Sequence, residues 1–295
     1  MKRRDFLATS AGATLALRGL SPLVRGAIET PIRFGYAALT WQGNDLQAID
    51  DIAALRFRGI QLRASAVARW GTNPQMLRDL LAERGLSFVA LSSGLVRLDP
   101  AAEAEDLALH LRHARFVRDA GGLYLQVVDE RPAGRAPTSD DFRRMGRLLT
   151  EIGRRTADLG IPLGYHNHLG NLGQAPDEVA QVLEAADPRF LRLELDIAHY
   201  RQAGGDPAHA VRRYAERLLF LHIKDVESPV PGGAPSSYRF VELGRGKVDL
   251  RAVFAALKQV NFQGWAIVEL DQSERPKESG AISRRYLTET LGLDV

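Results

Sequence analysis

Short apolar runs alternate with longer amphipathic segments from about residue 32 to the carboxyl end of the chain. Eight runs have the pattern of buried strands, and they begin at Ile32, Gly59, Leu86, Gly122, Ile161, Phe190, Leu218 and Gly264. Between them, apolar residues recur at the helical period in segments such as 73–84, 105–120, 140–159, 176–186, 207–217 and 250–259. Eight strand–helix units predict a parallel sheet closed into a single-domain α/β fold, the (β/α)8 TIM barrel.

The breaks between these segments agree with that prediction. Gly85 and Gly160 each end a helical pattern directly before a predicted strand, as C-terminal helix caps do. No Gly-x-Gly-x-x-Gly follows the first predicted strand, so a dinucleotide site is not supported. The longest irregular segment, 227–249, follows the seventh predicted strand and is rich in Pro, Gly and Ser. We expect it to lie over the catalytic rim of the barrel as a lid or binding loop.

The first 27 residues have a different pattern. Lys2, Arg3 and Arg4 precede a weakly apolar stretch at 8–17, which is too short to span a bilayer, and small residues near Ala27 offer a cleavage site. Arg-Arg-x-Phe-Leu resembles a twin-arginine export signal, and the alternative is an ordinary basic tail. We therefore expect a signal segment at 1–27, a barrel at 28–295, a periplasmic location and no stable membrane insertion.

Composition narrows the chemistry. The 295 residues, 45% of them hydrophobic, are enough for one large core. Cys is absent, which excludes disulfides, a thiolate nucleophile and Cys-ligated metals, so a metal would need His and carboxylate ligands. The chain carries 39 basic and 36 acidic residues; removing the five basic and one acidic residues of segment 1–27 leaves 34 against 35. Such a balanced surface gives no reason to propose a nucleic acid partner.

Four predicted strands end in potential metal ligands. The fifth strand ends in His166 and His168, the sixth in Asp196, the seventh in His222 and the eighth in Glu269. A parallel barrel brings these carboxyl ends together at one rim, where catalytic residues lie in barrel enzymes. Two histidines and two carboxylates meeting there would form a nitrogen and oxygen site for a divalent cation.

Each of these residues also has a structural interpretation. Asp196 could cap the helix that follows, with His199 placed to bind substrate or to orient a ligand. Glu194 alternates with Asp196 and could face the barrel interior, either as an outer partner of the metal or paired with a buried Arg. His222 could be a core histidine, although Lys224 after it is hard to explain by packing.

Two further assignments follow from burial and strand alternation. Glu269 interrupts a buried apolar strand, which is costly unless the carboxylate is paired or metal-bound, and it could serve both as ligand and as proton-transferring base. His166 and His168 lie two residues apart, so we expect one of them to touch the metal and the other the substrate. Aromatic residues that could stack on a sugar ring, or instead belong to the core, are Tyr36, Trp41, Trp70 and Phe240.

Five stretches have the form of a known family: GYHNH at 164–168, LELDIAHYRQAGGDP at 193–207, LLFLHIKDV at 218–226, LGRGKVDL at 243–250 and GWAIVELD at 264–271. In them the chain resembles the sugar phosphate isomerase/epimerase superfamily, the xylose isomerase-like TIM barrels, over roughly residues 32–290. The resemblance implies a divalent metal, Mn²⁺, Co²⁺ or Mg²⁺ with Zn²⁺ as a further candidate. It implies metal ligands at Asp196, His222 and Glu269, with His199 and Lys224 near the substrate. Together with the strand-end pattern, we expect metal ligands at His166, Asp196, His222 and Glu269 and catalytic roles for Glu269, His199, Lys224 and His168.

Two positions depart from the pattern of the superfamily. Many of its epimerases carry a Glu where His166 stands, and the Tyr-His-x-His pattern is closer to inosose dehydratase relatives. Arg245 stands between two glycines where an acidic or amide residue is common, so it could bind the substrate or form a salt bridge to Glu242.

The resemblance implies chemistry on a small carbohydrate or keto-sugar. Our main hypothesis is an isomerase or epimerase that removes a proton next to a carbonyl through a metal-stabilised enediolate. The alternative is a dehydratase or lyase of a keto-sugar or keto-inositol with the same metal, and a third hypothesis is a catalytically silent sugar-binding barrel. A nuclease like endonuclease IV would need more metal ligands than the sequence offers. Assembly into a homo-oligomer stays open.

Overall fold

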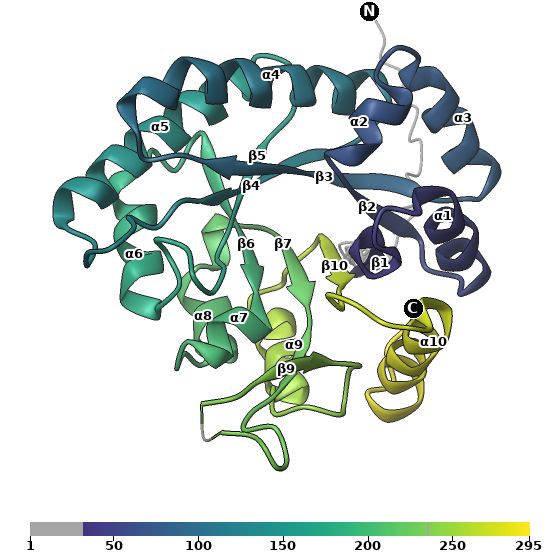
Figure 1. Cartoon of the computed structure of the whole chain (residues 1–295). Helices are drawn as coiled ribbons and strands as arrows, with labels where there is room; N and C mark the ends of the chain where they lie inside the picture. The colour runs from purple at the N-terminus through teal and green to yellow at the C-terminus, as the bar shows by residue number, and fades with distance from the viewer. Residues whose placement is uncertain (1–31, 235) are drawn as a thin grey trace, which may run out of the picture.

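A closed barrel of eight parallel strands forms the centre of the computed structural model, which describes residues 32–234 and 236–295 (Figure 1). The strands run around the barrel in the order β1-β10-β7-β6-β5-β4-β3-β2. Their bounds are β1 (Arg33–Ala37), β2 (Gly59–Arg63), β3 (Ser87–Val96), β4 (Tyr124–Asp129), β5 (Leu163–His166), β6 (Leu191–Asp196), β7 (Leu218–Ile223) and β10 (Trp265–Val268). The predicted single-domain TIM barrel is confirmed, and each of the eight predicted strands is found. The predicted signal segment lies outside the described residues.

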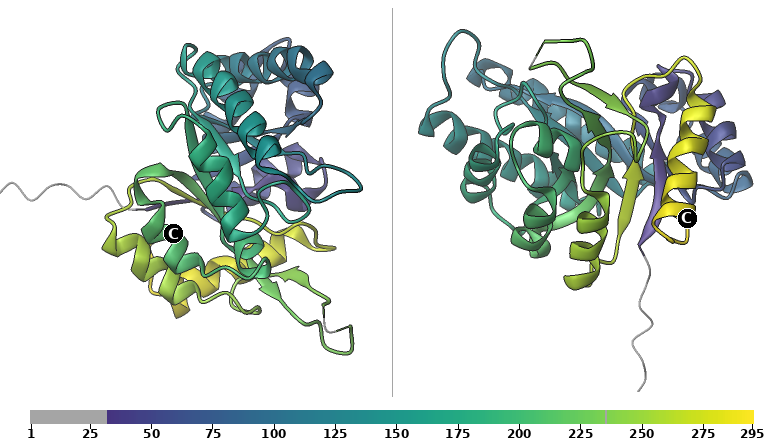
Figure 2. Two further views of the ribbon diagram at one scale, coloured as in Figure 1. Left: turned by 90° about the vertical axis from the view of Figure 1, so that its left-hand side faces the viewer. Right: turned by 90° about the horizontal axis from the view of Figure 1, so that it is seen from below.

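Helices cover the outside of the barrel (Figures 1 and 2). They are α1 (Asp45–Ala54), α2 (Ser65–Trp70), α3 (Pro74–Glu83), α4 (Glu103–Asp119), α5 (Ser139–Ala157), α6 (Pro176–Ala185), α7 (Ile197–Gln202), α8 (Pro207–Arg213), α9 (Leu250–Gln259) and α10 (Pro276–Arg285). Short turns of helix occur at η1 (Ala38–Trp41), η2 (Pro100–Ala102), η3 (Ala215–Arg217) and η4 (Tyr286–Thr290). The predicted helix at 207–217 is divided between α8 and η3. None of the helices in the described ranges has the length and hydropathy of a membrane span.

The barrel interior is divided into an apolar floor and a polar upper part. The floor is a cluster around Phe220 and Trp265, and Tyr124 stacks on Phe220 with ring centroids 5.5 Å apart. Gly59 makes room for this floor, because a Cβ there would lie 2.5 Å from the Trp265 ring. Above the floor, the strands carry buried polar side chains at Gln61, Gln126, His166, Glu194, Asp196 and His222. Because side chains alternate along each strand, these polar groups face the interior while the leucines of β6 pack against the helices.

Segment 227–249 contains most of a small hairpin over the site. β8 (Asp225–Glu227) pairs antiparallel with β9 (Arg239–Val241), and Phe240 of β9 lies 4.0 Å over the ammonium of Lys224. The buried Asp225 carboxylate accepts hydrogen bonds from the backbone N–H groups of Gly244 and Gly246, which anchors the returning chain. The prediction that this segment lies over the rim is confirmed.

A buried histidine pair joins α4 to β3 outside the barrel. The Ser93 hydroxyl lies 2.6 Å from Nδ1 of His110 and 2.9 Å from Nδ1 of His113. Burial lowers the pKa of both histidines, that of His110 to about 4. Both imidazoles are therefore neutral in the folded protein near pH 7.

We expect this pair to make the protein less stable in mild acid. The His110 pKa is depressed on folding, so between its ordinary value of about 6.5 and about 4 the unfolded chain binds more protons. The free energy of unfolding should therefore fall as the pH drops through this window, by roughly 3 kcal/mol for His110 at pH 4. Urea unfolding at several pH values measures the slope. His110→Gln should flatten it, and an unchanged slope in that variant would contradict the assignment.

Candidate functional site

Strands β5, β6 and β7 bring three of the predicted metal ligands together. In the register of these strands, His166 lies opposite Glu194, and Asp196 lies opposite His222. Ligand atoms of His166, Asp196 and His222 lie within 4.8 Å of one another, and all three side chains are buried. Glu269 follows β10, and its Oε1 is 3.5 Å from Nδ1 of His222. The four residues predicted as ligands thus share one site.

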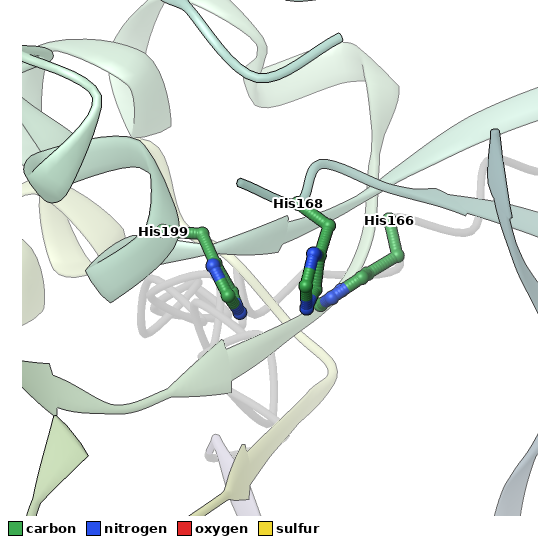
Figure 3. A group of neighbouring side chains, drawn as sticks. All are labelled: His166, His168 and His199. Atoms are coloured by element: carbon green, nitrogen blue, oxygen red, sulfur yellow. The ribbon is translucent and has the colours of Figure 1, made fainter. Parts of the chain in front are cut away.

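A second group of side chains adjoins this site. Ligand nitrogens of His166, His168 and His199 also lie within 4.8 Å of one another, and Figure 3 shows the three imidazoles directed toward a common space. The ring centroids of His168 and His199 are 3.9 Å apart. His166 belongs to both groups, whereas His168 is only partly buried. The expectation that one of His166 and His168 touches the metal and the other the substrate stays a prediction.

Asp196 serves the fold with one oxygen and the site with the other. Its Oδ1 accepts hydrogen bonds from the backbone N–H groups of Ala198 and His199 and so caps α7, while the buried Oδ2 has no hydrogen-bond partner in the described chain. Asn167 exchanges two hydrogen bonds with the Asp196 backbone, which ties the end of β6 to that of β5. Burial alone would raise the pKa of Asp196, but the charges of His199 and Lys224 hold it well below its usual range.

The tautomer of His222 is set by two buried amides. Its Nε2 donates to Gln61 Oε1 at 2.7 Å, and Gln61 in turn donates to Gln126 at 3.3 Å. The other ring nitrogen, Nδ1, faces three carboxylates: Glu194 at 3.1 Å, Glu269 at 3.5 Å and Asp196 at 3.6 Å. Burial lowers the pKa of His222, yet the charges of Glu194 and Glu269 outweigh it and raise the pKa to about 9. Nδ1 therefore requires a proton or a metal ion.

Lys224 and Glu269 form a buried ion pair beside this cluster. Lys224 Nζ lies 3.0 Å from Glu269 Oε1 and 3.4 Å from His199 Nε2, and it also contacts Asp271. Burial opposes both charges, but Glu269 raises the pKa of Lys224, while His222 and Lys224 lower that of Glu269 to about 2. Both groups thus stay charged at neutral pH.

Some features of the site were not predicted. Gln61, Gln126 and Asp271 were not singled out, although an amide in each of two apolar strands and a second acid two residues after Glu269 were visible signals. Of the aromatic candidates, Phe240 contacts the site, with its ring centroid 4.8 Å from that of His199. The other three, Tyr36, Trp41 and Trp70, are buried in the core.

Arg245 forms the salt bridge, one of its two alternatives, and it also lines a cavity next to Phe240, so substrate binding by Arg245 stays a prediction. Its guanidinium pairs with Glu242 at 3.0 Å.

The donor set fits a divalent cation. Five of the buried atoms without a hydrogen-bond partner in the described chain belong to this site: His166 Nδ1, Glu194 Oε1 and Oε2, Asp196 Oδ2 and His222 Nδ1. Two ligands bound at about 2.1 Å to one ion lie about 3.0–3.4 Å apart at angles of 90–109°. The contacts among these atoms, from 2.8 Å between His166 and Glu194 to 3.6 Å between Asp196 and His222, lie around that range. Imidazole and carboxylate ligands suit zinc and related dications.

Comparison with known proteins places the chain among barrel enzymes. Residues 49–289 match the profile of a family described as xylose isomerase-like TIM barrel. The inosose dehydratase of Lacticaseibacillus casei (strain BL23) is 23% identical over 305 residues, which cover 90% of this chain and 98% of that protein. A structure of the IOLI protein with a zinc atom has a TM-score of 0.74 at 15% identity and covers 88% of this chain and 98% of its own. A structure of L-ribulose 3-epimerase has a TM-score of 0.71 at 19% identity, and the match covers 88% of this chain and 95% of that chain.

Proposed function

Because the chain belongs to the xylose isomerase-like TIM barrel family, we propose that it is a metal-dependent dehydratase of a keto-inositol or keto-sugar. The observation that carries the proposal is the set of partnerless buried atoms of His166, Asp196 and His222 at the carboxyl rim of the barrel. The sequence alone favoured an isomerase or epimerase. The relatives named inosose dehydratases, which cover 82–90% of this chain, support the alternative.

The residues divide into holding and reacting groups. His166, Asp196 and His222 would hold the dication, which supplies Lewis-acid polarisation of the substrate carbonyl. The low pKa of Glu269 keeps it as a carboxylate, the form that accepts a proton from the carbon next to that carbonyl. Lys224 stays cationic and stabilises negative charge that develops on oxygen. His168 and His199, in the adjoining group, would orient the hydroxyl that leaves as water.

A cavity large enough for a small substrate lies near these groups, although the proposed ligands, Lys224 and Glu269 are not among its lining residues. The cavity, of about 450 Å³, is lined by Phe240 from the hairpin, by Leu270 next to Glu269, and by Glu242, Gln272 and others. Ligand cavities of about 300 to 1,000 Å³ are typical for small molecules. The polar side chains there can hydrogen-bond to the hydroxyl groups of a sugar or an inositol.

The product distinguishes the candidate functions. Protein loaded with Mn²⁺, Co²⁺ or Zn²⁺ would be incubated with a panel of keto-inositols and keto-sugars. Ultraviolet absorbance of an unsaturated ketone supports the dehydratase, whereas a new ketose or epimer on chromatography without that absorbance supports the isomerase. Binding without turnover at any metal loading would leave the silent sugar-binding barrel.

Removing the Phe240 ring should weaken substrate binding more than turnover. In Phe240→Ala we expect KM to rise about 2- to 10-fold, because the ring lines the cavity and an aromatic contact contributes about 0.5–1.5 kcal/mol. Steady-state kinetics measures the change. Tyr238→Ala is the matched control, since Tyr238 is exposed and contacts Phe240 rather than the charged groups. Equal effects of both substitutions would contradict this role.

Export stays a proposal from residues 1–27. It rests on the adjacent arginines Arg3 and Arg4 and on the short apolar stretch after them. Mass spectrometry of the protein purified from its native cells tests it, because export predicts a mature chain that begins near residue 28.

A further inference from the structure

Glu194 lies deep in the site, between two of the imidazoles. Its side chain is fully buried, with Oε2 at 2.8 Å from His166 Nδ1 and Oε1 at 3.1 Å from His222 Nδ1. Among the residues that the structure describes, no other carboxylate lies within 4.0 Å of both rings. The strand register explains this position, because Glu194 is the residue of β6 directly opposite His166 of β5.

These close contacts are not hydrogen bonds. Neither oxygen of Glu194 nor either Nδ1 atom has a hydrogen-bond partner in the described chain, although the atoms nearly touch. A buried carboxylate is unfavourable unless a positive charge lies beside it, and here that charge can come from a protonated imidazole or from a metal ion.

The sequence also allowed a buried arginine as the partner of Glu194, but the structure places two histidines beside it instead. Within the described ranges, the ion-pair partners of Glu194 are the histidines alone. Its carboxylate therefore has no permanent positive charge beside it.

Glu269 has a different environment. Its Oε1 is paired at 3.0 Å with the ammonium of Lys224, a buried group that remains charged. The carboxylate predicted as the fourth ligand thus already has a cationic partner. Glu194 has the two imidazoles alone as ion-pair partners in the described chain, and its Oε1 lies closer to His222 Nδ1 than Glu269 does.

We propose that Glu194 is a direct ligand of the metal, together with His166, Asp196 and His222. A dication bound by these four residues would give a partner to each of the five buried atoms of the site that now lack one. Glu269 then keeps its ion pair with Lys224 and acts in proton transfer. This inference rests on the proposed metal-dependent function and deepens it by naming a ligand on β6.

Two isosteric variants distinguish Glu194 from Glu269 as the fourth ligand of the metal. Wild type, Glu194→Gln and Glu269→Gln are stripped with a chelator and titrated with Zn²⁺ in competition with a chromophoric chelator. We expect Glu194→Gln to bind Zn²⁺ at least about 100-fold more weakly, the upper end of what loss of an outer partner causes. Glu269→Gln should bind it about as tightly as wild type. The absorption spectrum of the Co²⁺-loaded protein should change in Glu194→Gln alone, because only that variant loses a ligand.

Several outcomes would overturn the proposal. Wild-type affinity and an unchanged Co²⁺ spectrum in Glu194→Gln would do so, as would loss of Zn²⁺ from Glu269→Gln instead. Thermal unfolding of the metal-free forms shows whether each variant is folded. If Glu194→Gln is not folded, the Glu269→Gln titration decides. Loss of Zn²⁺ binding in Glu269→Gln refutes the assignment, and retained binding supports it. A wild type that binds no dication refutes both the ligand and the function. Zinc binding as expected without turnover of any keto substrate refutes the function and leaves the ligand in place.

Discussion

His222→Ala is expected to bind a divalent metal at least about 100-fold more weakly than wild type and to lose turnover with it. The imidazole of His222 presents Nδ1 to Glu194, Asp196 and Glu269 at 3.1–3.6 Å, at the centre of the polar cluster. Without it, three carboxylates face one another and the site keeps a nitrogen ligand from His166 but loses the one between the carboxylates. Elemental analysis after dialysis measures the bound metal.

The matched control for this variant is His209→Ala. His209 is an exposed histidine on α8, so its loss should leave metal content and activity unchanged. Full metal content and activity in His222→Ala would remove the metal centre from the proposal.

Glu269→Gln is expected to lower kcat by about 10²- to 10⁴-fold, the usual contribution of a positioned proton-transfer group. The amide keeps the shape of the side chain but cannot accept a proton, and it removes one of the carboxylate partners of Lys224. If Glu194 completes the ligand set, metal content should stay at the wild-type level, so the loss would lie in the chemical step. Steady-state kinetics at saturating metal and substrate measures it.

Asp271→Asn distinguishes a proton-transfer role of Glu269 from a role in balancing the charge of Lys224. Asp271 also contacts Lys224, but its side chain is 41% exposed. Its replacement should therefore have a much smaller effect on kcat. Comparable losses in both variants would indicate that the charge of Lys224 matters and that Glu269 is not the base, and an active Glu269→Gln would refute its catalytic role outright.

The barrel and its rim could be predicted because they depend on local patterns. Each buried strand is a short apolar run, and a polar residue at the end of such a run has few structural explanations. This reasoning placed His166, Asp196, His222 and Glu269 in one site. It also left open whether Asp196 caps a helix or faces the site, and the structure shows one oxygen in each position.

What could not be predicted depends on neighbouring strands. The contact of Glu194 with two imidazoles requires the β5–β6 register and an irregularity between Leu193 and Glu194 where β6 pairs with β7. The link from Gln61 to His222 joins residues 161 positions apart. The choice between isomerisation and dehydration is hidden for another reason, because both begin with the same base and metal and differ only in the fate of the substrate.

The aromatic floor of the barrel has a consequence for the route by which a substrate enters. The stacked Tyr124 and Phe220 rings and the Trp265 indole fill the amino end of the interior. The interior is therefore closed at that end, and in the proposed reaction a substrate would reach the metal from the opposite rim, on the side of the β8–β9 hairpin.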